Sequence, residues 1–175
     1  MRHIALLRAV NVGGTATIRM AELRSLGERL GFAAVTTLLQ SGNLTFETDE
    51  ADPAQLEQRW EKAVEEHFGV ATAFIIRTAP QWQALIEANP FAAEAKADPS
   101  HLLVLPSKGS IAEAGVGALR GAIRGRESVA ASERCLYAVY PDGIGTSKLT
   151  TKVIERHLGT LVTGRNWNTV LKLAG

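Results

Sequence analysis

The pattern of apolar and polar positions predicts four strands and two helices in the first half of the chain. Two apolar series recur at helical spacing, one running from Met20 to Leu30 and one from Leu56 to Phe68. The apolar runs typical of strands fall at residues 4–7, 35–39, 44–46 and 73–76. This gives the order β-α-β-β-α-β, which is the order of ferredoxin-like folds.

The same order begins again after residue 100. Strands are predicted at residues 102–105, 129–131 and 136–140 and near 161–163, with helices over 111–123 and 147–158. A further helix is predicted over 166–173 at the end of the chain. The fold class is therefore α+β, with two ferredoxin-like (α/β-plait) halves, a connecting helix and a C-terminal helix.

The sequence also indicates where the halves end. Thr78 to Gln81 caps a connecting helix, and the stretch 89–99, with two prolines and many alanines, is typical of an inter-domain link. We therefore expect a first domain over residues 1–78, a connecting helix and linker over 79–100, and a second domain over 101–175.

Two features should stabilise the fold of the first half. Asp52 to Gln55 forms a capping box with Pro53 at the first helical position. Trp60 occupies the centre of an apolar stripe, so we expect it to be buried, and Trp60→Ala should cost about 3–5 kcal/mol.

Composition limits the class of protein. Of the 175 residues, 46% are hydrophobic and 21% are charged, which excludes a wholly disordered or collagen-like chain. No apolar run approaches the roughly 18 residues of a membrane span. Arg8 interrupts the first apolar run too early for a signal peptide. A single cysteine, Cys135, excludes an internal disulfide, so a cytoplasmic protein without membrane contact is expected.

Charge is spread unevenly along the chain although its net value is only +1. Residues 1–88 carry 8 Lys and Arg against 11 Asp and Glu, whereas residues 89–175 carry 11 against 7. The net charge argues against a protein coated in nucleic acid, while the excess of cations in the second half favours contacts with anions.

The strongest local signal is the turn from Tyr140 to Thr150. Thr146 or Ser147 is a natural N-cap, so a helix is expected to begin here with its free N–H groups beside Ser, Thr and Lys side chains. Lys148, Lys152 and Arg156 follow four residues apart. The alternative is a well-capped helix with a solvated basic stripe. The glycine pattern of nucleotide-hydrolase phosphate loops is absent.

Other donor-rich stretches could form part of a site. The segment 163–169 contains Arg165, Asn166 and Asn168. The alternative for this segment is structural: Asn166 caps the last helix, and Trp167 packs that helix onto the second sheet. Arg8 and Asn11, followed by Gly13 and Gly14, lie just past a predicted strand, and Ser41 and Asn43 lie at a hairpin turn.

Support for other chemistry is poor. The four histidines have no metal-ligand spacing, so no metal and no cofactor are expected. Asp142 is a candidate general base, but Asp in Pro-Asp-Gly is first a turn residue. The strand predicted at 43–47 lacks the Lys/Arg-Gly-Phe/Tyr consensus of RNA-recognition domains, and the strand predicted at 3–7 has no base-stacking aromatic.

Several motifs in fixed order resemble an uncharacterised bacterial family, domain of unknown function 1697. They are Leu6 to Gly14, Gln40 to Asn43, Asn89 to Phe91, Ser147 to Leu149 and Arg165 to Val170. The resemblance implies a cytoplasmic protein of two ferredoxin-like halves. It provides no catalytic residue, because no activity is established for the family. Its motif positions, which we take as candidate ligand-binding residues, are Arg8, Asn11, Gly13, Gly14, Ser41, Asn43, Ser147, Lys148, Arg165, Asn166 and Asn168. Gly42 is a further motif position, and Ala9 and Thr146 depart from the family, which more often has Gly and Arg there.

These residues are mainly donors and loop formers, which bind oxyanions more readily than they transfer protons. The leading hypothesis is binding of a phosphorylated small molecule or a nucleic-acid backbone in a cleft between the halves, where Arg8, Asn43, Lys148 and Arg165 should converge. One alternative is a transferase- or hydrolase-type enzyme using Lys148, Arg165 and Asp142. Another is a structural adaptor without ligand. The sequence leaves the reaction and the oligomeric state open.

Overall fold

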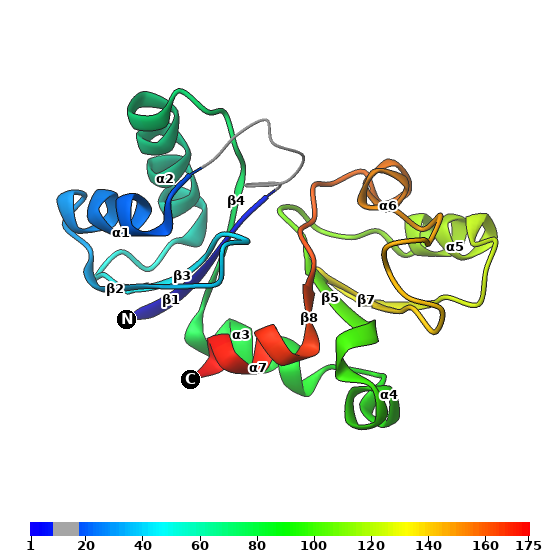
Figure 1. Ribbon diagram of the computed structural model, residues 1–175. Helices are drawn as coiled ribbons and strands as arrows, with labels where there is room; N and C mark the ends of the chain where they lie inside the picture. The colour runs from blue at the N-terminus through cyan, green and yellow to red at the C-terminus, as the bar shows by residue number, and fades with distance from the viewer. Residues whose placement is uncertain (9–17) are drawn as a thin grey trace. The chain divides into compact units, whose positions relative to one another are not determined.

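The computed structural model describes residues 1–8 and 18–175 and contains two four-stranded antiparallel sheets (Figure 1). The chain divides into two compact units, Met1–Gln83 with Ala174 and Ala84–Leu173 with Gly175. The strand orders are β2-β3-β1-β4 and β6-β7-β5-β8, so both sheets follow the ferredoxin-like arrangement. The predicted α+β fold of two such halves is confirmed.

The first unit has two helices on one face of its sheet (Figure 1). Its elements are β1 (Arg2–Leu7), α1 (Met20–Arg29), β2 (Ala33–Leu38), β3 (Asn43–Glu47), α2 (Pro53–Phe68) and β4 (Phe74–Thr78), with α3 (Ala79–Glu87) following at its boundary. The Asp52 side chain accepts the Ala54 N–H at the start of α2, and Gly69 ends the helix in the left-handed conformation at φ 68°. The capping box predicted here is only half formed, because the Asp52 N–H donates to the Glu50 carboxylate.

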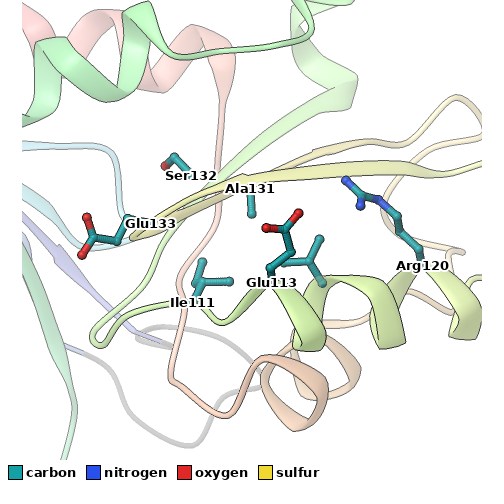
Figure 2. A pocket seen from close by; sticks show the side chains of 7 residues that line it. Ile111, Glu113, Arg120, Ala131, Ser132 and Glu133 are labelled. Carbon is teal, nitrogen blue, oxygen red and sulfur yellow. The ribbon is translucent and has the colours of Figure 1, made fainter.

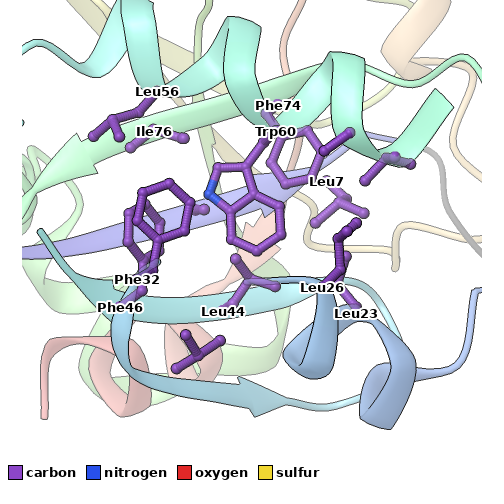
Figure 3. Packing of buried hydrophobic residues seen from close by; sticks show 14 of the residues in the cluster. Leu7, Leu23, Leu26, Phe32, Leu44, Phe46, Leu56, Trp60, Phe74 and Ile76 are labelled. Carbon is purple, nitrogen blue, oxygen red and sulfur yellow. The ribbon is translucent and has the colours of Figure 1, made fainter. Parts of the chain in front are cut away.

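Trp60 on α2 is at the centre of the first core (Figure 3). It is fully buried, as predicted, and its ring lies 5.4 Å from the rings of Phe32 and Phe74 and 5.7 Å from that of Phe46. A side chain at Gly27 of α1 would place its Cβ 2.7 Å from this indole. The aromatic cluster therefore requires glycine where α1 crosses it.

The edge strand β4 is closed by side chains. The Glu61 and Glu57 carboxylates of α2 accept the N–H groups of Phe74 and Ile76 at 2.9 and 3.0 Å. The next outward N–H, that of Thr78, donates to Gln81 Oε1, while the Thr78 hydroxyl accepts the Gln81 N–H. This reciprocal bonding confirms the predicted cap of α3, and it occupies donors that would otherwise be open to strand addition.

The second unit repeats the arrangement. Its elements are α4 (Ala92–Ala97), a 3₁₀ turn (Pro99–His101), β5 (Leu102–Pro106), α5 (Glu113–Ala122), β6 (Ser128–Ser132), β7 (Cys135–Val139), α6 (Thr151–Leu158), β8 (Arg165–Asn166) and α7 (Trp167–Ala174). Part of the stretch expected to be a link is thus helical. The last strand lies at 165–166 rather than 161–163, where only an isolated bridge joins Val162 to Ser107.

Two helices of this unit differ from their predicted bounds. α6 begins at Thr151 rather than Ser147, because Thr150 is its N-cap and accepts the Val153 N–H. α5 spans 113–122 rather than 111–123 and contains three glycines. Gly115 has a packing reason, since a Cβ there would lie 2.7 Å from the His157 carbonyl oxygen of α6. None of the described helices is long and apolar enough to cross a membrane.

Candidate functional site

Two loops of the second unit lie side by side. The Arg126 guanidinium donates two hydrogen bonds to the Asp142 carboxylate, and the Ser147 hydroxyl donates to Glu127 Oε1 at 2.6 Å. Ser147 Oγ also accepts the Leu149 N–H at 3.0 Å. The segment 124–127 after α5 and the segment 142–149 before α6 therefore form one local surface.

Exposed cations line this surface and the helix that follows it. We call Arg124, Lys148, Lys152 and Arg156 the basic surface, and all four side chains are exposed. Within residues 1–8 and 18–175, none of the four makes an ion pair. Lys152 and Arg156 share one face of α6, as predicted, whereas Lys148 lies in the loop before the helix. The basic surface thus presents its positive charge to solvent.

The start of α6 adds to the positive field. Thr150 accepts the Val153 N–H, and the Ile154 N–H bonds the Thr150 carbonyl, as expected for the first turn. The N–H groups of Thr151 and Lys152 come earlier in this turn and face away from the helix, which gives its N-terminus partial positive charge. Lys148 and Lys152 flank this N-terminus in sequence.

The three nearby carboxylates have hydrogen-bond partners outside the basic surface. The Asp142 carboxylate forms an ion pair with Arg126, and the Glu127 carboxylate accepts a hydrogen bond from the Ser147 hydroxyl. The Glu155 carboxylate accepts the Val162 N–H at 3.0 Å. Hydrogen bonding from Arg126 holds the pKa of the exposed Asp142 carboxyl below its usual value. An ion-paired carboxylate with a lowered pKa is a weak base, which disfavours the general-base role considered for Asp142.

Two residues of the predicted cluster at 163–169, Arg165 and Asn166, bond to their own segment of the chain. Arg165 is buried, and its guanidinium donates to the Thr163 hydroxyl and the Gly164 carbonyl at 2.8 and 2.9 Å. Burial lowers its pKa to about 10, so it remains a cation at neutral pH. Asn166 accepts the Thr169 N–H as the N-cap of α7, and Asn168 is exposed on the first turn of that helix.

The candidate residues of the first unit are also bonded to their own chain. Asn43 is fully buried, and its amide donates to the Leu38 carbonyl and to Ser41 Oγ, which closes the β2–β3 turn. The half-buried Arg8 donates its N–H to Ala73 and accepts from the Thr72 hydroxyl through its carbonyl. Asn11, Gly13 and Gly14 lie outside the described residues.

The sequence indicated Lys148 as a candidate and placed Lys152 and Arg156 on a basic stripe whose role it left open, but it did not indicate Arg124. Arg124 lies in the stretch Ile123-Arg124-Gly125-Arg126, which matches no ligand-binding motif. Its relevance follows from the tertiary bonds that bring the segment 124–127 to the segment 142–149. No group of three or more potential metal ligands occurs in the part of the chain that the structure describes, and Cys135 is buried.

Comparisons with known proteins address the chain as a whole. A family model described as "Protein of unknown function (DUF1697)" matches residues 1–137. The chain belongs to this family. The match includes the family motifs at 6–14, 40–43 and 89–91, whereas Ser147, Lys148, Arg165, Asn166 and Asn168 lie beyond it.

The fold also has a solved counterpart. The structure of the conserved bacterial protein SP0830 from Streptococcus pneumoniae is similar, with a TM-score of 0.76 and 23% identity, over 99% of this chain and 96% of that one. At this identity the similarity concerns the fold alone. Comparison with curated proteins gave no significant match.

Proposed function

We propose that this DUF1697 protein binds an anionic ligand, a phosphorylated small molecule or a nucleic-acid backbone, through the basic surface. The observation that carries the proposal is that four exposed cations are free of ion pairs among the described residues, while the neighbouring carboxylates are bonded elsewhere. Several donors around one region bind phosphate usefully where a single exposed Lys or Arg does not.

The spacing of the cations along the chain favours contacts with successive phosphates. Lys152 and Arg156 are four residues apart on one face of α6, and Lys148 lies in the loop shortly before that helix. The cavity described below carries two carboxylates and is a poor place for an anion. We propose a bacterial cytoplasmic location, because a chain with one buried, unpaired cysteine, Cys135, is compatible with a reducing compartment.

The proposal is tested by titrating a fluorescein-labelled single-stranded oligonucleotide with the full chain at several salt concentrations. The variant Lys148→Gln/Lys152→Gln should bind about tenfold more weakly, and its log–log salt slope should be smaller by about 1 to 1.4. The matched control is Lys96→Gln, an exposed cation of α4 in the same unit, which should leave both quantities unchanged.

Pyrophosphate provides the second arm of the experiment. If the ligand is a phosphorylated small molecule, pyrophosphate should bind the wild-type chain saturably at constant ionic strength, and more weakly in the double variant. Equal binding of both anions by the wild type, the double variant and the control would contradict the proposal, as would the absence of binding to either anion. The second result favours the adaptor without ligand.

A further inference from the structure

A second candidate site lies in the same unit, between α5 and the edge strand β6 (Figure 2). The cavity measures about 260 Å³, close to the lower end of small-ligand pockets. Its exposed lining is mainly polar: Glu113, Arg120 and Glu133 supply charged groups, and Ile111, Val116 and Ala131 contribute the smaller apolar part. None of these residues belongs to the basic surface.

The backbone of β6 offers hydrogen bonds to this cavity. β6 and β7 form a hairpin with Glu133 and Arg134 as its two-residue loop, and Ser132 pairs with Cys135 next to that loop. In such hairpins the pair next to the loop is hydrogen-bonded, and alternate residues then face outward. Val129 is one of these, because its carbonyl accepts from Arg120 Nε and Nη2 at 3.2 and 3.1 Å. Ala131, two residues on, directs its N–H and carbonyl to the same outer edge.

Ala131 is the open position on this edge. On one side Arg120 covers the Val129 carbonyl, and on the other the Ile111 N–H donates to the Glu133 carbonyl at 2.7 Å. Ala131 itself is exposed, and its methyl group points toward α5 in Figure 2. An added strand would therefore find one complete backbone donor–acceptor pair, flanked by groups already bonded.

The charges set the direction of such a strand. Glu113 and Glu133 are exposed, and neither carboxylate has a hydrogen bond or ion pair to the residues described. Glu133 directly follows the C-terminal end of β6. Arg120 lies near the other end of the strand, where it bonds Val129. A ligand with an ammonium near Glu133 and a carbonyl near Arg120 would run antiparallel to β6. In that orientation one ligand residue can exchange both backbone bonds with Ala131.

We propose that the cavity binds the free amino terminus of a short extended peptide, which adds as an antiparallel strand at Ala131. The ammonium lies against Glu113 and Glu133, and the first residues cover Ile111 and Val116. The cavity is small, so we expect dissociation constants of about 1 mM for a tripeptide.

The experiment follows the amide of Ala131 by ¹⁵N–¹H NMR while the full chain is titrated with Ala-Ala-Ala-amide. Saturable shifts are expected at Ala131 and at the start of α5. The acetylated tripeptide, which lacks the ammonium, should bind at least fivefold more weakly, and a tripeptide N-methylated at its second residue should also lose affinity.

Variants separate the backbone contribution from the charge contribution. Glu113→Gln/Glu133→Gln should weaken binding about fivefold, whereas Glu94→Gln, at an exposed position on α4, should have no effect. Ala131→Pro should abolish binding because it removes the outward N–H. The variant should still fold, because proline is tolerated at such edge positions. If that variant does not fold, the modified peptides on the wild-type chain decide. Equal binding of free and acetylated peptides, or no saturable shift up to about 10 mM, would overturn the proposal.

Discussion

At the scale of single residues, several polar side chains are buried because the backbone requires their donors or acceptors. Asn43 bonds the Leu38 carbonyl, Arg165 bonds the Gly164 carbonyl, and Glu57 accepts the Ile76 N–H. The sequence identified the first two as donors in loops, which is also how ligand-binding residues look. A loop pattern does not reveal whether a donor serves a nearby carbonyl or a ligand, since both need the same groups.

His3 provides a prediction about pH. It is fully buried on β1, its ring stacks on Phe46 at 5.5 Å, and Nδ1 lies 3.1 Å from the Met1 carbonyl oxygen. Burial lowers the pKa of His3 from its ordinary value of 6.5. The unfolded chain therefore binds the proton more readily than the folded one. Stability from neutral His3 is complete above about pH 6.5 and is lost as the pH falls through the lowered pKa.

The measurement is thermal unfolding of the wild type and of His3→Leu between pH 7.5 and 5. We expect the wild type to lose more of its melting temperature across this range than the variant, because the variant lacks the group that titrates. The same change in both proteins would show that His3 does not contribute to acid sensitivity.

At the scale of elements, the apolar periodicity predicted almost every helix and strand, while their ends depended on tertiary bonds. Thr146, Ser147 and Thr150 are all suitable N-caps, but the Ser147 hydroxyl bonds Glu127, and the helix begins after Thr150. The last strand was misplaced because β8 consists of two polar residues, Arg165 and Asn166, which show no apolar alternation.

The bonds from α2 to the edge strand β4 give a prediction at this scale. Glu57→Met keeps the volume and helix propensity of the side chain but leaves the buried Ile76 N–H without its carboxylate acceptor. The free energy of unfolding should fall by about 1–3 kcal/mol. Glu65→Met, at an exposed position on the same helix, should change it by less than about 0.5 kcal/mol. Equal effects in urea unfolding would contradict a role for Glu57 at this edge.

At the scale of the whole molecule, the repeated element order predicted two sheets of the same topology, and the structure has them. That inference succeeded because burial of an apolar face constrains every strand and helix at once. The basic surface was only partly predictable, since the contact between the segments 124–127 and 142–149 depends on Arg126–Asp142 and Ser147–Glu127. Neither pair has a sequence spacing typical of a known motif. The predicted convergence of Arg8, Asn43, Lys148 and Arg165 stays a prediction.

The most direct test of anion binding is a map of the residues that respond to a simple phosphate. The ¹⁵N-labelled full chain is titrated with inorganic pyrophosphate at constant ionic strength, and amide shifts are followed by NMR. The account predicts saturable shifts at Arg124 and from Lys148 to Lys152, including the first N–H groups of α6, with no comparable shifts around Lys96. Saturable shifts confined to other parts of the chain, or no saturable shift at all, would contradict it.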